Sequence, residues 1–227
     1  MMELLTQLDI TSFKITLKLA LISTIILLII GIPISYFLAY GNVRLKSLME
    51  ASISLPLVLP PSVLGFYLLI FMNQNGILGS IWVKLFGHQP AFHFDGLVIA
   101  SVIFSLPFMI HPLTAGFRSI DKELIEASYT LGKTALSTLF HVILPNMKSS
   151  IITGLVISFA HIIGEFGVVL MIGGNIEGET KVVSIAIYDA VERLDYFTAH
   201  LYAGLLFIFS FVTLALFYHL NKKFEVK

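Results

Sequence analysis

The chain of 227 residues contains no cysteine, which excludes disulfide bonds, thiol catalysis and cysteine-ligated metal sites. Charge is also scarce: Lys, Arg, Asp and Glu make up 12% of the residues, against about 25% in a soluble domain. The positive and negative side chains balance to a net charge of zero, so the chain lacks the basic field with which proteins bind nucleic acid. These shortages argue against a soluble domain, a thiol enzyme and a nucleic-acid-binding protein.

Sequence patterns of catalytic and nucleotide sites are missing as well. The seven histidines are scattered without a metal-ligand spacing such as HExxH, and no glycine-rich phosphate loop occurs. We therefore expect a chain that is not an enzyme and that binds no cofactor, metal or ATP itself. An enzyme within the membrane, one hypothesis for so apolar a chain, would need a catalytic pair or a metal site.

Long apolar runs dominate what is present, because 57% of the residues are hydrophobic and the mean hydropathy is +0.92. A bilayer core needs about 20 apolar residues per helix, and five segments reach that length. These segments are Ile15–Tyr40, Ala51–Met72, Gly96–Gly116, Ile151–Gly173 and Ala199–Leu220. The sequence predicts an all-α, polytopic membrane protein with about five transmembrane helices. Without an internal repeat, residues 1–227 are expected to form a single transmembrane domain.

Charged residues between these segments predict the topology. Glu3 and Asp9 stand where a cleavable signal peptide would be basic, so the first segment should remain as a span. Nine cations fall on one side of the bilayer: Arg44, Lys46, Arg118, Lys122, Lys133, Lys148, Lys222, Lys223 and Lys227. The other five are Lys14, Lys18, Lys84, Lys181 and Arg193. Because cytoplasmic loops carry the excess of Lys and Arg, we expect the N-terminus outside and the C-terminus in the cytoplasm. The outward loop 174–198 contains an amphipathic stretch that could form a short interfacial helix.

A polar, helix-prone segment, Glu126–Pro145, stands between the third and fourth predicted spans. Its apolar residues recur at helical spacing. Gly132 permits a kink or a close backbone approach, and Pro145 should stop the helix. An amphipathic helix on the cytoplasmic side predicts a surface that docks a partner. A plain surface helix on a loop is the alternative interpretation.

Prolines interrupt the second predicted span at Pro56, Pro60 and Pro61. Proline removes a backbone donor and kinks a helix. In lipid such a break survives only where protein or a cavity satisfies the freed backbone groups. The break is therefore a candidate for lining a path through the membrane, with a kinked structural helix as the alternative.

Glu165 places a carboxylate inside the fourth predicted span, about 21 Å from its start at 1.5 Å per residue. Intramembrane acids are costly and usually mark function. His161 lies one helical turn earlier on the same face, and Gly164 and Gly167 favour a close helix approach. A gate and a buried pair that fixes helix packing are both compatible with this pattern. An anion ligand is not, because a carboxylate repels an anion.

The Glu126–Pro145 segment resembles the EAA loop of ABC importer permeases. The matching residues are Glu126, Ala127, Ser128, Gly132, Leu144 and Pro145. Ser128 stands where the family has a second alanine, and Val142 where it has isoleucine; both changes keep size and shape. In that family the loop forms a coupling helix in a groove of the ATPase subunit. The resemblance places the permease core at about residues 10–218 and the coupling loop at 117–148.

Further motifs are similar to the oxyanion branch of these permeases, which transports molybdate, tungstate and sulfate. They are the run SLPLVLPPSVLG at 54–65, GEFG at 164–167 and GET at 178–180. The second and third closely resemble molybdate permeases. The resemblance implies that Pro56, Pro60 and Pro61 line the path.

The resemblance also implies a homodimer in the cytoplasmic (inner) membrane, with two ATP-binding subunits inside and a molybdate-binding protein outside. The expected function is ATP-driven uptake of molybdate or tungstate. The alternatives are a sulfate-type oxyanion permease and an ATP-independent channel or secondary carrier. A channel or a secondary carrier would require several paired intramembrane charges or a selectivity motif.

Overall fold

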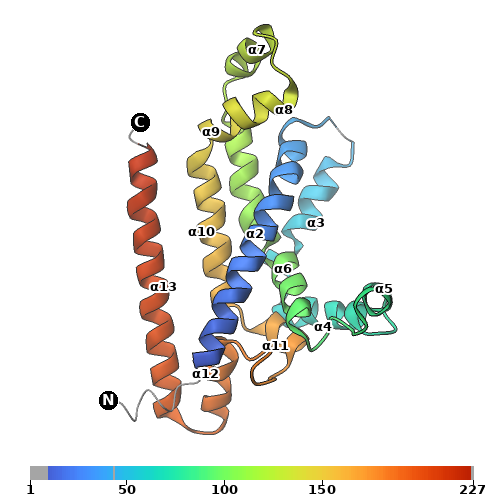
Figure 1. Cartoon of the computed structure of the whole chain (residues 1–227), viewed down its shortest axis with the longest axis vertical. Coiled ribbons are helices and arrows are strands. Elements are labelled where there is room, and N and C mark those ends of the chain that lie inside the picture. The colour runs from blue at the N-terminus through green and yellow to red at the C-terminus, as the bar shows by residue number, and fades with distance from the viewer. Residues whose placement is uncertain (1–9, 43, 226–227) are drawn as a thin grey trace.

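The computed structural model describes residues 10–42 and 44–225, and these residues form helices and turns with no strand (Figure 1). Most of the helices belong to membrane-length rods or to shorter pieces at their ends. In chain order they are α2 (Ile10–Tyr40), α3 (Lys46–Val58), α4 (Pro61–Met72), α5 (Ile77–Phe86), α6 (Phe94–Arg118), α7 (Lys122–Thr130), α8 (Ala135–Thr138), the π-helical turn Leu139–Ile143, α9 (Leu144–Asn146), α10 (Lys148–Gly164), α11 (Gly167–Gly173), α12 (Val183–Glu192) and α13 (Tyr196–Glu225). The predicted all-α fold is confirmed.

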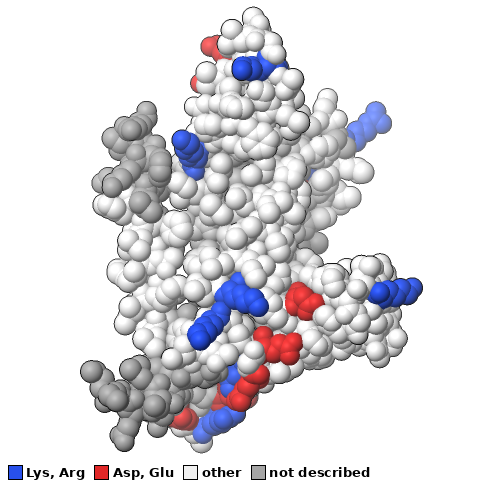
Figure 2. Space-filling view, viewed as in Figure 1, with Lys and Arg blue, Asp and Glu red and all other residues white. Residues whose placement is uncertain are grey.

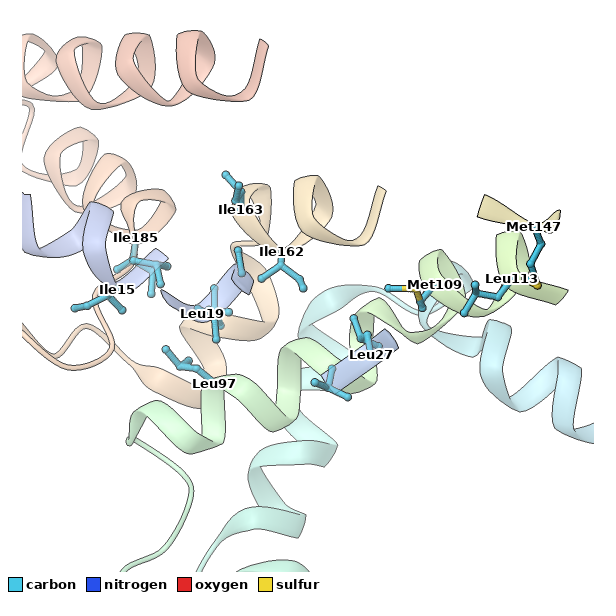
Figure 3. Packing of buried hydrophobic residues seen from close by; sticks show 14 of the residues in the cluster. Ile15, Leu19, Leu27, Leu97, Met109, Leu113, Met147, Ile162, Ile163 and Ile185 are labelled. Carbon is cyan, nitrogen blue, oxygen red and sulfur yellow. The ribbon is translucent and has the colours of Figure 1, made fainter. Parts of the chain in front are cut away.

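The core lies between α2, α6 and α10, which pack along most of their lengths. Side chains from all three helices meet in one cluster, among them Leu19 of α2, Leu97 of α6 and Ile162 of α10 (Figure 3). Near the opposite end of α2, the Tyr40 hydroxyl donates to the carbonyl of Phe117 at 2.6 Å. Such helix-to-helix hydrogen bonds and close packing are what hold helices together in lipid, where apolar burial gives little driving force.

Three helices, α2, α6 and α13, are long and apolar enough to cross a membrane. Two bent pairs pass the same test: α3 with α4, and the 135–146 segment with α10. The count of about five spans therefore holds if each bent pair is one span. The fourth predicted span, 151–173, is wrong as a single helix, because α10 ends at Gly164 and α11 begins at Gly167.

Helix α13 packs along α10 and α12, but the rest of its long apolar surface is uncovered (Figure 1). A helix that is apolar on all sides needs lipid or a further protein surface around it. The short helix α12 lies within the amphipathic stretch of the 174–198 loop, as the sequence predicted. The sequence did not predict α5, which lies in the 73–95 loop.

Charged groups are concentrated toward the two ends of the helix bundle, with a belt free of Lys, Arg, Asp and Glu between them on the visible face (Figure 2). The end of α2 at Tyr40, the start of α3 at Lys46, α7 and α8 lie at one end, and α12 lies at the other (Figure 1). The two predicted groups of cations are thus separated along the bundle. Glu3, Asp9 and Lys227 lie outside the described residues, and the side chains of Lys222 and Lys223 are not described.

Candidate functional site

The segment from α7 to α9 projects beyond the end of the helix bundle (Figure 1). The single helix predicted for Glu126–Pro145 is wrong in detail, because α7 ends at Thr130 and α8 begins only at Ala135. Gly132 makes the turn between them with φ of +76°, a conformation that favours glycine. Lys133 N donates to Ser128 O at 3.1 Å and Gly132 N to Tyr129 O at 2.9 Å. These two bonds form a Schellman motif, which ends α7 and reverses the chain.

The predicted kink at Gly132 is therefore present, whereas the predicted close approach is not. A Cβ added at Gly132 would meet no atom within 4 Å among the described residues. The glycine is needed for its backbone angle, and the space beside it is open.

Ser128 and Thr138 connect α7 to α8 by a hydrogen bond between their hydroxyls at 2.9 Å. Both side chains are buried. The departure from alanine at position 128 thus has a structural reason, since the serine hydroxyl satisfies a buried threonine ten residues later. The sequence carried no signal for this pair, because the two residues belong to different helices.

We expect Ser128→Ala to destabilise the α7–α8 pair by ~1–3 kcal/mol, because it leaves the buried Thr138 hydroxyl without its partner. The double variant Ser128→Ala with Thr138→Val should recover most of that loss, since both polar groups are then removed together. Hydrogen exchange of the α7 and α8 amides in the detergent-solubilised protein measures the local stability. Additive effects of the two substitutions would show that the hydroxyls are not coupled.

Large apolar side chains are exposed on this projecting tip. Leu131, Leu136 and Phe140 are 80%, 68% and 62% exposed. Glu126 and Ala127 are exposed beside them on α7. Large apolar side chains exposed together on one short segment are typical of a site that contacts another protein.

Leu144 and Pro145 lie in α9, after a π-helical turn, and α9 ends at Asn146, one residue after the stop that the sequence predicted. Proline cannot donate a backbone hydrogen bond to the preceding turn. The wider π turn accommodates this loss, and the Asn146 side chain donates to Val142 O at 2.7 Å. The chain then bends by 74° into α10. The segment therefore ends in a corner that is joined directly to the long helix α10.

Two helix breaks face each other at the other candidate site. The first separates α3 from α4 with a bend of 113° at Leu59 and Pro60. Both residues precede a proline and are extended, with ψ of 136° and 137°. Pro61 then starts α4, a position that proline favours. Pro56 stays inside α3 and does not break it, in contrast to the prediction.

The second break, between α10 and α11, contacts the first. A Cβ on Gly167 would lie 2.6 Å from Cβ of Pro61, and a Cβ on Gly65 would lie 2.8 Å from Cβ of Met171. The glycines therefore allow α11 to pack directly on α4. Gly164, in contrast, faces open space, so the close approach predicted there is absent. The structure thus brings Pro61 and Gly167 together, although 105 residues separate them in the sequence.

The sequence predicted that Glu165 lies inside a continuous helix, and this is wrong. Glu165 lies in the extended backbone of the second break. Its Oε1 accepts a hydrogen bond from Val168 N at 2.9 Å, which satisfies a first-turn amide of α11. Its carbonyl accepts from the Ser184 hydroxyl of α12 at 2.6 Å. Glu165 is only 7% exposed. The carboxylate therefore acts as a helix cap at a buried break.

His161 lies near Glu165 as predicted, with 3.9 Å between Nε2 and Oε2. That separation is long for a hydrogen bond. His161 Nδ1 is 2.9 Å from the Ser105 hydroxyl, and its ring stacks on Phe108 at 4.0 Å between centroids. The sequence did not indicate Ser105 or Ser184, because their spacing follows no motif. Together these contacts tie the break to α6 and α12.

The end of the bundle opposite α7 carries a charged cavity of about 570 Å³ between α12 and α13. Lys181 Nζ contacts Asp189 at 2.8 Å, and Arg193 contacts the same carboxylate oxygen at 3.0 Å. The hydrogen bond from Lys181 holds the pKa of Asp189 below its ordinary value, so the carboxylate stays ionised. Among the described residues, no group of three His, Asp or Glu side chains could hold a metal ion.

Comparison with known proteins adds sequence relatives along most of the chain. A molybdenum transport system permease protein ModB of Azotobacter vinelandii is 44% identical over 214 residues, covering 94% of this chain and 95% of that protein. A probable sulfate transport system permease protein cysT of Chlorella vulgaris is 30% identical over 207 residues, covering 91% of this chain and 77% of that protein.

A solved structure has the same fold. It is a bacterial alginate ABC transporter in complex with an alginate pentasaccharide-bound periplasmic protein, with a TM-score of 0.78 at 17% identity. The match covers 96% of this chain and 81% of that chain. Residues 31–226 match the model of the family described as binding-protein-dependent transport system inner membrane component. On the strength of that match and of relatives at 30–44% identity, this chain belongs to the family of binding-protein-dependent transport system inner membrane components.

Proposed function

We propose that this chain is the permease subunit of an ATP-driven importer, and that the α7–α9 segment couples it to a cytoplasmic ATPase. The observation that carries the proposal is the projecting tip with Leu131, Leu136 and Phe140 exposed. Apolar side chains that lie beyond the membrane end of the bundle are not covered by lipid, so a protein partner is expected to cover them. Glu126, Ala127 and Gly132 lie on the same tip, at the positions of the EAA pattern.

The tip connects to the membrane helices through short links. It follows α6 after Arg118 and leads through the Leu144–Pro145 corner into α10. A displacement of the tip is therefore passed to α6 and α10, the helices of the core. Rigid-body rocking of packed helices about an interface is a known route for such transitions. ATP-driven closure of the ATPase subunits would supply the displacement.

The orientation follows from charge. The cation-rich end with α7 and α8 faces the cytoplasm in this proposal, so the N-terminus lies outside and the C-terminus inside. A substrate-binding protein would deliver its cargo at the opposite end, near α12. The exposed apolar sides of α3, α4 and α13 leave surface for lipid and for a second copy of the chain, in keeping with a homodimer that would bind two ATPase subunits.

Molybdate is the substrate that the relatives favour, with tungstate as a close chemical analogue. The relative at 44% identity is named for molybdenum transport, and the relative at 30% identity for sulfate. Molybdate, the oxyanion of molybdenum, and sulfate are both tetrahedral, so both relatives support this class of substrate. The larger identity supports molybdate, and a sulfate-type permease is the second candidate.

Uptake of molybdate into vesicles tests this function. The vesicles hold this chain, its ATPase subunit and its binding protein, with sulfate and tungstate as competitors. We expect uptake that requires ATP and all three components and that tungstate inhibits more strongly than sulfate. Stronger inhibition by sulfate would assign the chain to sulfate transport. Uptake by this chain alone without ATP would replace the proposal with a channel or secondary carrier.

A further inference from the structure

A cavity of about 420 Å³ opens between α3 and α6, at the same end of the bundle as α7. It is separate from the paired helix breaks described above. Its polar lining consists of Glu50, Ser54, His111, Thr114 and Arg118. Glu50 and Ser54 lie one turn apart on α3, and the other three recur at helical spacing on one face of α6. Two polar helix faces therefore meet across a hollow in an otherwise apolar bundle.

Two polar contacts lie along the cavity. At its end near α7, Arg118 Nη2 donates to Glu50 Oε1 at 2.7 Å. Further along α6, Ser54 Oγ lies 3.2 Å from Nε2 of the exposed His111, and the Ser54 hydroxyl donates to Glu50 O at 2.8 Å. His111 is seven residues before Arg118 on α6, which places it about 10 Å deeper along the helix axis. The hollow thus extends inward from the predicted cytoplasmic boundary.

Donor groups in this cavity are only partly used. Both hydrogen bonds recorded for Arg118 within the described chain leave from Nη2, one to Glu50 and a longer one of 3.4 Å to Leu38 O. Its Nη1 and Nε remain for another acceptor. Thr114 is 7% exposed, and its buried Oγ1 has no hydrogen-bond partner among the described residues. The donors open to a ligand in this cavity are therefore the Nη1 and Nε groups of Arg118.

We propose that this cavity is a cytoplasmic-side binding site for a tetrahedral dianionic oxyanion on its way out of the permease; this rests on the proposed function. Arg118 provides the guanidinium fork that matches such an anion. Glu50 occupies Arg118 when the site is empty and competes with the anion.

Competition between Glu50 and the anion for Arg118 favours release of the anion, as an exit site requires. An uncompensated arginine would hold a dianion and slow its release. Glu50 lowers the affinity both by pairing with Arg118 and by repelling the anion. The anion therefore leaves when the Glu50–Arg118 pair re-forms. Because Glu50 and Arg118 act in opposite directions on the ligand, their substitution separates this role from a purely structural ion pair.

Equilibrium dialysis with radiolabelled molybdate tests the site, using the permease assembled with its ATPase subunits in phosphatidylcholine nanodiscs without binding protein. We expect Glu50→Gln to tighten binding about fivefold and Arg118→Gln to weaken it about tenfold or more. Arg44→Gln removes an exposed arginine at the same end that does not line the cavity, and it should leave binding unchanged. Gel filtration of each assembled complex checks that the variants fold.

Opposite shifts for Glu50→Gln and Arg118→Gln support the site. Equal shifts, or no molybdate binding by either the wild type or Glu50→Gln, overturn it, because a structural ion pair responds alike to loss of either partner. Repeating the titration with phosphatidylglycerol in the nanodiscs tests whether a lipid phosphate binds the site in place of molybdate. If that lipid abolishes molybdate binding to the wild type, the site belongs to a lipid phosphate and the proposal is wrong. ATP-driven uptake by the wild type alongside any of these failures leaves the importer function standing.

Discussion

Gly132→Trp is expected to reduce ATP-driven uptake by at least about 30-fold, while the protein still reaches the membrane. Gly132 lies on the projecting tip, and a Cβ there would meet no atom of the described residues within 4 Å, so a larger side chain is directed into open space. It would instead fill the space that a docked ATPase needs. Loss of a central interface contact costs about 2 kcal/mol or more, which corresponds to the stated factor. Uptake in reconstituted vesicles and co-purification of the ATPase subunit measure the two effects.

Two further variants at the same position separate bulk from backbone strain. Gly132→Ala also suffers from φ of +76°, at ~1–2 kcal/mol, but adds little volume. Gly132→Asn is better tolerated in this conformation. Both should keep most of the uptake. If Ala abolishes uptake as fully as Trp, the turn geometry and not docking bulk is decisive. Normal uptake by the Trp variant would contradict the coupling role of this segment.

Glu165→Ala is expected to destabilise the protein by ~1–3 kcal/mol and to abolish uptake, whereas Glu165→Gln should retain most of both. The alanine removes the acceptor of the Val168 amide at a buried helix start. The glutamine keeps an oxygen at that place and changes only the charge. Thermal unfolding in detergent together with vesicle uptake measures the pair of variants.

The same pair decides between the two interpretations of this buried acid. Val169→Ala, which shortens a buried side chain on the same short helix, provides a stability-matched control without touching the cap. A Glu165→Gln protein that melts normally but transports nothing would show that the ionised carboxylate is needed, as a gate would require. Equal behaviour of Gln and Ala in unfolding would show that the Val168 hydrogen bond carries no weight.

The structure of the α7–α9 segment could be predicted from local chemistry only in part. The positive φ at Gly132 and the extended residues before Pro60 and Pro61 depend on neighbours in the sequence, so the turn and the first break could be inferred from it. The joining of Ser128 to Thr138 depends on how two helices fold back on each other. No periodic pattern announces such a contact.

The second break shows the same limit more clearly. The apolar run 151–173 has the length of one span, and hydropathy alone does not divide it. The division at Glu165 depends on the hydrogen bonds that Glu165 accepts from Val168 N and from the Ser184 hydroxyl. It also depends on the packing of α11 against Pro61 and Gly65 of α4. Glu165, which the sequence placed inside one helix, therefore caps the start of α11 instead.

The sequence by itself determined the class of this protein: apolar length, helical spacing and the uneven distribution of Lys and Arg are one-dimensional properties. They led to an all-α membrane protein with a polar segment suited to docking. Tertiary structure decided which residues meet. The contact of Gly167 with Pro61 and the cavity between Glu50 and Arg118 both join positions more than 60 residues apart. Such sites arise from helix packing, whose partners and crossing angles depend on many side chains at once.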